Sequence, residues 1–232
     1  MFKPSFLFLV YHGQLFPDLW KSYKDLPRFV YNKSPHRLDS FLRDATNINY
    51  FHKTGWAEIG IVDAMIELLS KAYNDTDSTH FVFCSGTCVP VLSCSEFLKS
   101  LRNQKKGIVS LGEKKPHRDK FSQWSIINRQ FCEKILGIDR ETIKDYTRKF
   151  LIQKQIEDHI HAAFDEIYIP AVCSYLGIVL EDFFDIRPVT HHEWHGSSAA
   201  FVTKSYFLSE RKDLKNKGFF FKRKVMNGCT NR

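Results

Sequence analysis

An acidic pair at Asp165-Glu166 is the part of the sequence best suited to acid–base chemistry. The pair precedes an apolar stretch that continues through Ile167 and Val172, so both carboxylates fall in the first turn of an expected helix. A carboxylate held beside a hydroxyl can accept its proton and act as a general base. The alternative is structural, because the helix dipole favours acidic side chains at a helix N-terminus.

Polar or small residues follow three expected strands. They are His12-Gly13, Asn32-Lys33 with Ser34, and Ser85-Gly86-Thr87-Cys88. In sheets whose strands alternate with helices, ligands bind outside the carboxyl ends of the strands. None of the three segments forms a GxGxxG or P-loop pattern, so ordinary turn chemistry also accounts for each.

A basic triplet, Lys222-Arg223-Lys224, follows three phenylalanines near the end of the chain. Cations anchored beside a buried strand can neutralise the charge that develops on a diphosphate leaving group. A solubilising tail is the alternative interpretation of the same composition.

Neither the histidines nor the cysteines indicate a metal site. His191, His192 and His195 cluster around Glu193, but the HExxH order of zinc enzymes is absent, which favours a surface or substrate-facing role. No pair of the six cysteines has CxxC spacing, so we expect mostly free, buried thiols.

The composition suits one substantial α/β domain. The chain has 232 residues, of which 43% are hydrophobic and 15% aromatic. Its net charge of +8 indicates an anionic partner, such as nucleic acid, a membrane surface or a phosphorylated substrate. No zinc-finger or RNA-binding signature accompanies the basic residues, so a nucleotide diphosphate fits as well as a polynucleotide.

Strand and helix patterns alternate along the chain, which predicts a mostly parallel sheet flanked by helices. Apolar residues in the longest helical pattern recur at spacings of three and four. We expect strands at residues 6–11, 28–31, 80–84 and 108–111. We expect helices at residues 17–24, 36–43, 57–73, 126–136, 141–155 and 165–176, and a charged helix or loop at 204–217.

Several short segments together resemble one known family, in the same order over roughly residues 5–226. These segments are residues 6–13 with Leu19-Trp20, 29–35, 55–69, 81–90 (similar to LLSESCIPL), 122–129 (SQW…NR, with Trp124), 165–170 (DEHYFPT) and 221–225 (FARKF). The family is that of the core-2/I-branching β-1,6-N-acetylglucosaminyltransferases, and the chain is most similar to its plant and virus-like branch.

The resemblance implies a GT-A-type, Rossmann-like fold in a single catalytic domain, residues 1–232. It implies inverting transfer of a sugar from a UDP-sugar to a hydroxyl of a glycan acceptor, with no divalent metal or other cofactor. The sugar is N-acetylglucosamine by family default, with xylose or another sugar as alternatives. Glu166 would be the general base, and Lys224 with Arg223 would stabilise the leaving UDP.

The resemblance also suggests which residues bind the substrates. Donor-binding positions are His12, Gly13, Asn32 and Lys33, together with the two cations. The acceptor or donor pocket is assigned to Ser85, Thr87, Cys88, Trp124, Asp165, Trp194 and His195. The expected partners are therefore a UDP-sugar and a glycan acceptor, without nucleic acid.

Two departures from the family pattern leave alternatives open. Gly86 replaces a glutamate, and His195 follows Trp194 where the plant-like branch usually has arginine. A non-catalytic sugar- or nucleotide-binding module is therefore the second hypothesis, and a basic nucleic-acid-binding protein is the third. Because the apolar run at residues 6–11 is too short for a signal or a span, we expect a cytoplasmic or virus-encoded cytosolic enzyme rather than a Golgi one.

Overall fold

A computed structural model describes residues 1–10, 16–33, 39–48, 58–111, 120–159, 162–191, 194–195, 198–199 and 201–226. Its centre is a seven-stranded sheet in the order β3-β2-β1-β4-β7-β6-β8. The strands are β1 Pro4–Val10, β2 Arg28–Asn32, β3 Thr46–Asn47, β4 His80–Ser85, β6 Gly107–Val109, β7 Ile126–Asn128 and β8 Phe184–Ile186. Only β7 runs antiparallel to its neighbours, so the expected mostly parallel α/β sheet is confirmed.

The central strands are apolar on both faces, as expected of a parallel sheet that is covered on both sides. Phe6, Phe8 and Val10 of β1 point into one hydrophobic cluster. Leu7, between them, points into the other. This period of two fixes the register of β1 against both neighbours, because a slip of one residue would exchange the two faces.

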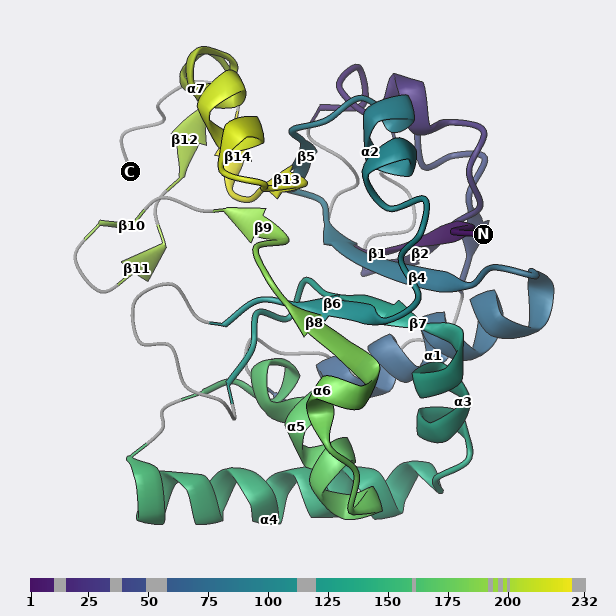
Figure 1. The fold of residues 1–232 in the computed structure, drawn as a ribbon, viewed down its shortest axis with the longest axis vertical. Helices are drawn as coiled ribbons and strands as arrows, with labels where there is room; N and C mark the ends of the chain where they lie inside the picture. Colours follow the sequence, from purple (N-terminus) through teal and green to yellow (C-terminus); the bar gives the residue numbers. More distant parts are fainter. Residues whose placement is uncertain are drawn as a thin grey trace.

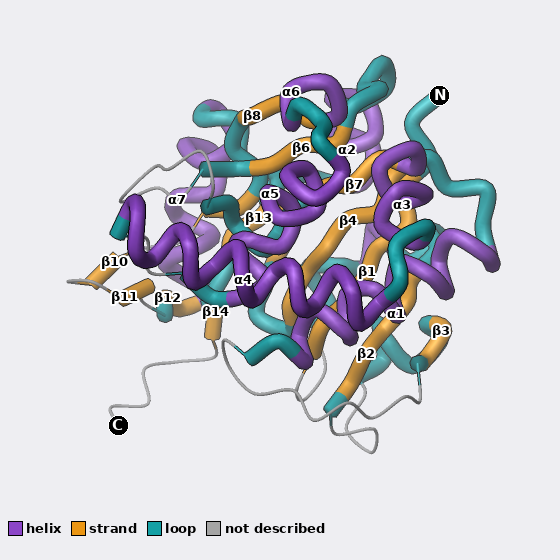
Figure 2. Tube along the Cα trace, turned by 90° about the horizontal axis from the view of Figure 1, so that it is seen from below, coloured by secondary structure: helices purple, strands orange, loops and turns teal. Residues whose placement is uncertain are grey.

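Helices cover the two faces unequally (Figure 1). One face is covered by α1 Gly60–Asp75, α3 Arg129–Leu136, α4 Arg140–Asp158 and α5 Phe164–Leu176. The other is covered by the 3-10 turn η1 Lys21–Tyr23, α2 Cys94–Ser100 and α7 Lys204–Asn216. Figure 2 shows α4 as the outermost helix on the first side, where it packs against α5. Among the described residues, no helix combines the length and apolar character needed to cross a bilayer.

Three sequence-based predictions of helices are wrong in part. The pattern at residues 126–136 divides into strand β7 and helix α3, which begins at Arg129. The reason is local: the Asn128 side chain accepts a hydrogen bond from the Phe131 N–H and caps α3, so the helix starts late. Residues 17–24 form turns and η1. In the second predicted helix, residues 36–43, the described part is 39–43, and residues 40–43 form a turn.

Small strand pairs bring the end of the chain back to the end of β4. β13 Phe221–Lys222 lies between β5 Val89–Pro90 and β9 Thr190–His191. β14 Val225–Met226 pairs with β12 Val202–Thr203, and β10 Trp194–His195 pairs with β11 Ser198–Ala199. The short helix α6 Leu180–Phe183 precedes β8. This closure places β13 and Val225, on either side of Arg223 and Lys224, beside residues that lie more than 130 positions earlier in the chain.

Candidate active site

Glu166 stands in the first turn of α5, as the sequence predicts. Its Oε2 accepts a hydrogen bond of 3.1 Å from the backbone N–H of Ala163, which precedes the helix. The Glu166 side chain therefore caps α5, as the structural alternative in the sequence analysis predicted. The same contact fixes the position of the carboxylate, and 29% of the side chain remains exposed.

The segment that contains Trp124 is attached to the same turn of α5. The Phe121 N–H donates to the Glu166 backbone oxygen at 2.9 Å. Lys120, one residue earlier, places its Nζ 3.2 Å from Glu166 Oε2. Farther along, the Phe83 N–H of β4 donates to the Ser125 oxygen at 3.0 Å. Residues 120–125 thus join the start of α5 to the sheet, with Trp124 between them.

Asp165 is buried, and its carboxyl group is only partly compensated. The residue is 6% exposed, and its Oδ1 has no hydrogen-bond partner among the described residues. Burial, with repulsion from Glu166, raises the pKa of Asp165 to about 6 against the opposing attraction of Arg223. Such a perturbed acid at a helix start is typical of functional sites.

Arg223, the residue after β13, interacts electrostatically with this carboxylate. Its guanidinium carbon is 5.4 Å from the centroid of the Trp124 ring, a cation–π geometry. The Arg223 N–H donates to the His191 oxygen at 2.8 Å, which fixes the backbone after β13. Trp124 is 4% exposed, and its Nε1, like Asp165 Oδ1, has no partner within the described part of the chain.

Lys224 adopts a backbone conformation that non-glycine residues rarely adopt, with φ of 58°. Its Nζ lies 5.2 Å from the centroid of the Phe201 ring, which is 55% exposed. Burial and then the neighbouring charge of Arg223 lower the pKa of Lys224 below its ordinary value. Two cations are therefore held close together, an arrangement that an anionic ligand would stabilise.

Residues at and just after the end of β4 contact the segment that contains Arg223 and Lys224. The Val225 N–H donates to the Thr87 oxygen at 3.3 Å, which joins β14 to the turn that follows β4. Ser85 and Thr87 are half-buried and hydrogen-bond to each other through their side chains. Cys88 is 1% exposed, and its carbonyl accepts from the Trp20 indole at 2.9 Å. Cys88 therefore supports the site from the core, and Ser85 and Thr87 stand nearer its surface.

The other candidates differ in how far the structure places them. Asn32 ends β2 and is buried, and the exposed Lys33 donates its N–H to the last oxygen of β1 at 3.2 Å. The backbone of Trp194 and His195 forms β10, whereas their side chains lie outside the description. His12, Gly13 and His192 lie outside the described residues altogether.

Lys222 has a different role from the two basic residues that follow it, and two further residues, Lys120 and Phe201, contact the candidate site. Lys222 is fully buried and forms an ion pair of 2.8 Å with Glu210 of α7, so it supports the fold rather than a clamp. Lys120 and Phe201 join the site through Glu166 and Lys224. No sequence signal identified them, because each contact joins residues that are distant or unremarkable in the sequence.

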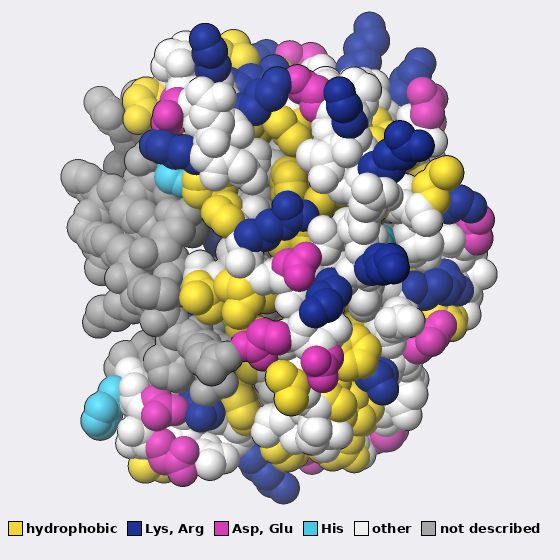
Figure 3. All heavy atoms as spheres, in the orientation of Figure 1, with side chains coloured by type: hydrophobic (Ala, Val, Ile, Leu, Met, Phe, Trp, Pro, Cys, Tyr) yellow, Lys and Arg dark blue, Asp and Glu magenta, His cyan; other side chains and the backbone are white. Residues whose placement is uncertain are grey.

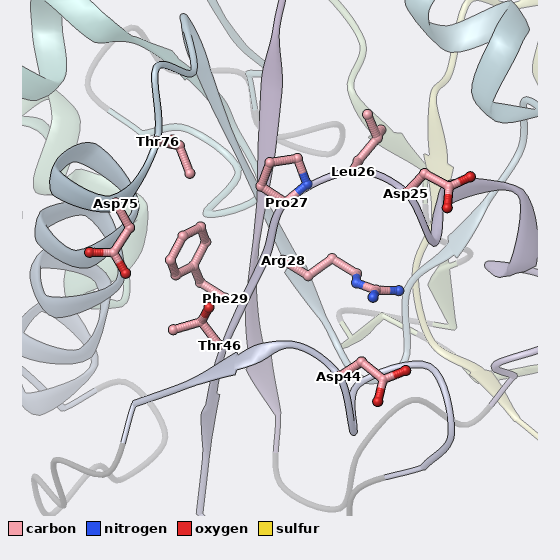
Figure 4. Close-up of a pocket in the computed structure, with 9 residues that line it drawn as sticks. All are labelled: Asp25, Leu26, Pro27, Arg28, Phe29, Asp44, Thr46, Asp75 and Thr76. Carbon is pink, nitrogen blue, oxygen red and sulfur yellow. The ribbon is translucent and has the colours of Figure 1, made fainter.

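Within the described ranges, no group of three or more His, Cys, Asp or Glu side chains could hold a metal ion. Cys84, Cys88, Cys94, Cys132 and Cys173 carry free thiols, as expected. A cavity of about 420 Å³ lies beside the start of β2, where Asp25 and Asp44 lie near the Arg28 guanidinium (Figure 4). It contains none of the candidate residues.

Comparison with known proteins supports the interpretation of the sequence. No protein-family model matches the chain. The protein "Glycosyltransferase BC10" of Oryza sativa subsp. japonica is 24% identical to it over 208 residues, which cover 75% of this chain and 49% of the rice protein. The chain therefore spans about half the length of this curated relative. The structure titled "Crystal Structure of A197 from STIV" aligns at 11% identity with a TM-score of 0.36, over 59% of this chain and 69% of that one.

The chain is thus distantly homologous to a plant glycosyltransferase of the core-2/I-branching family. This finding confirms the resemblance on which the sequence analysis depends.

Proposed function

We propose that the chain is a glycosyltransferase that moves a sugar from a UDP-sugar to a hydroxyl of a glycan acceptor. The observation that carries this proposal is that Asp165, next to Glu166 at the start of α5, interacts electrostatically with Arg223 of the β13–β14 connection, which lies against the Trp124 ring. A base and a diphosphate-binding cation are the two groups that metal-independent sugar transfer requires. The distant homology to a glycosyltransferase supports the assignment.

Glu166 is the general base in this proposal. Both described contacts of its carboxylate, from Ala163 and from Lys120, engage Oε2. Oε1 is then the oxygen that accepts the proton of the acceptor hydroxyl as that hydroxyl attacks the anomeric carbon. The bond from that carbon to the diphosphate oxygen breaks on the opposite face of the sugar, so the anomeric configuration inverts. The contacts to Oε2 keep the carboxylate oriented without occupying the reacting oxygen.

Arg223 and Lys224 stabilise the departing UDP. The diphosphate gains negative charge as the sugar leaves, and two cations that repel each other in the free protein offset this charge. Their attraction to the ligand is strengthened because both side chains are partly buried. This pair takes the role that a divalent metal has in other nucleotide-sugar enzymes, so the proposed reaction needs no metal.

The donor sugar nucleotide lies across the carboxyl ends of the strands. Asn32 and Lys33 at the end of β2 contact its nucleoside, and Ser85 and Thr87 after β4 face the diphosphate and sugar. This placement follows the general rule for ligands of open α/β sheets. Because β2 and β4 both pair parallel to β1, Asn32 and Ser85 at their carboxyl ends lie on the same side of the sheet, which supports this placement.

A non-catalytic nucleotide-sugar-binding module is the second candidate function. Gly86 favours it, because the corresponding family segment carries a glutamate there and this chain has no carboxylate at that position. Nucleic-acid binding is a weaker alternative. Lys and Arg side chains are spread over the face shown in Figure 3, with Asp and Glu among them, rather than gathered in one stripe.

A UDP-release assay over a panel of UDP-sugars, with glycan acceptors and with or without EDTA, tests the proposal. We expect turnover with at least one donor and no loss of turnover in EDTA. UDP binding without transfer or donor hydrolysis would instead identify a binding module. A strongly salt-dependent affinity for RNA or DNA, with no affinity for UDP, would identify a nucleic-acid-binding protein.

A further inference from the structure

The cavity beside the start of β2 is large enough to hold a small molecule (Figure 4). Its volume of about 420 Å³ falls within the range of small-molecule sites in proteins. Three segments that are distant in the sequence form its wall. They are residues 25–29, Asp44 with Thr46, and Asp75 with Thr76.

This cavity and the proposed transfer site lie at opposite ends of β2. Arg28 is the first residue of the strand and Asn32 is the last, so about 13 Å of extended chain separates them. β3 pairs with β2 at Phe29 and Val30 and begins at Thr46, so the edge of β2 at Arg28 lies beyond this pairing. A ligand in the cavity is therefore distinct from the sugar that is transferred.

Arg28 supplies the hydrogen-bond donors of the cavity. Its side chain points between Asp25 and Asp44 (Figure 4). The guanidinium carbon lies 4.6 Å from the centroid of the Phe41 ring, which holds one side of the group. Nε is buried and has no hydrogen-bond partner among the described residues. Burial lowers the pKa of Arg28, against the attraction of Asp44 and Asp25.

Carboxylates supply the acceptors, and their charge is partly offset. Asp25 and Asp44 are exposed at the mouth of the cavity and lie near Arg28. Asp75, the last residue of α1, forms an ion pair of 2.9 Å with Lys71. Three carboxylates are thus set against two cations, so neither an anionic nor a strongly cationic ligand is favoured.

The ligand must combine donors with acceptors. A carboxylate only accepts hydrogen bonds and a guanidinium only donates them, whereas a hydroxyl group does both. Adjacent hydroxyls on one ring can therefore donate to the aspartates and accept from Arg28. Leu26 and Pro27 line the same cavity and offer apolar atoms to the C–H groups of such a ring.

We propose that this cavity is a second carbohydrate site, which binds a neutral sugar through adjacent hydroxyls held by Arg28, Asp25 and Asp44. The sugar is either a free monosaccharide or one unit of a glycan, because both present the same hydroxyls. Binding here requires neither Glu166 nor bound UDP, so the inference goes beyond the proposed function.

An NMR titration of the ¹⁵N-labelled chain with the methyl β-glycosides of N-acetylglucosamine, galactose and xylose tests this inference. At least one glycoside should shift amide signals around Arg28 and Thr46, with or without UDP. Asp25→Ala and Asp44→Ala should each weaken this binding about tenfold and change UDP affinity less than about twofold. Both carboxylates are exposed, so the variants are expected to fold. Asp145→Ala, on the exposed surface of α4, is the matched control.

The outcomes separate this inference from the proposed function. Unchanged glycoside affinity in both aspartate variants, or shifts confined to α5 and Arg223, would overturn it. Binding of spermidine at the cavity, with no binding of any glycoside, would also overturn it and identify a cation site. Glycoside binding here by a protein that binds no UDP would support it and contradict the proposed function. Tighter binding of a disaccharide than of its methyl glycoside unit would support it and identify a glycan as the ligand.

Discussion

Lys120 Nζ lies 3.2 Å from Glu166 Oε2, so the proposed base forms an ion pair before any substrate arrives. Both side chains are more than a quarter exposed, which makes the pair weak as a source of stability. Its value is geometric, because it acts with the Ala163 N–H to hold one carboxylate oxygen and present the other. Lys120, which no sequence pattern identified, is therefore expected to affect catalysis.

Replacing Lys120 with methionine should lower kcat about five- to tenfold and leave UDP affinity nearly unchanged. The loss is expected because the carboxylate keeps only its contact to Ala163 and samples unproductive orientations. Lys120→Arg should recover most of the activity, since it retains the cation. Steady-state kinetics of the two variants test this, and a large rise in KM for the donor with unchanged kcat would contradict it.

Removing either clamp cation should weaken UDP binding. We expect Arg223→Met and Lys224→Met each to lower UDP affinity at least tenfold, because in the proposed mechanism each partly buried cation binds the diphosphate. Lys215→Met provides the matched control, since Lys215 is exposed on α7 and pairs with Glu96 away from the site. Calorimetry in EDTA measures the three affinities. Equal UDP affinities in all three variants would show that Arg223 and Lys224 do not bind the diphosphate.

Asp165 should make stability fall as pH rises through the mildly acidic range. The pKa of Asp165 is about 6 in the folded protein and has an ordinary value of 3.8, so the folded chain holds this proton longer than the unfolded chain. The group therefore destabilises the fold by up to about 3 kcal/mol above pH 6 and not at all below about pH 4. Loss of this destabilisation should stabilise Asp165→Asn above pH 6.

Urea unfolding of the unsubstituted protein and Asp165→Asn at pH 4, 5, 6 and 7.5 measures this effect. The difference between their free energies of unfolding should grow with pH and level off above about 6. A difference that is the same at every pH would show that Asp165 does not titrate in this range.

Gly107 of β6 should tolerate no side chain. A Cβ atom there would lie 2.5 Å from the Ile126 oxygen and 2.6 Å from the Phe184 ring. Gly107→Ala is therefore expected to lower the free energy of unfolding by about 1–3 kcal/mol. Gly137→Ala is the control, because its nearest contact would be 3.3 Å and its loss should be much smaller. Equal unfolding midpoints for the two variants would contradict the close packing of β6.

The sheet could be predicted from the sequence because its strands are apolar on both faces and stop at clear turn residues. The expected strands at 6–11, 28–31 and 80–84 lie within one or two residues of β1, β2 and β4. The strand β7 was missed because its two isoleucines, Ile126 and Ile127, join the apolar pattern of α3, and only the cap at Asn128 separates the two elements. Local periodicity does not reveal such a boundary.

The candidate site could be predicted only in part. The family resemblance selected Trp124 and Arg223, which are in contact in the fold, and Glu166, whose neighbour Asp165 interacts electrostatically with Arg223. Lys222 looks the same as its neighbours in the sequence, yet it is buried against Glu210 because alternate residues of β13 point to opposite sides. Lys120 and Phe201 became visible only through long-range contacts, which no short motif encodes.

The central claim is that Glu166 is the base of a sugar transfer, and the rate of UDP release by Glu166→Gln tests it most directly. Glu157→Gln, on the exposed surface of α4, is the matched control. The account predicts that Glu166→Gln binds UDP as the unsubstituted protein does and turns over at least a hundredfold more slowly, while Glu157→Gln keeps full activity. A Glu166→Gln variant with normal turnover would contradict the account.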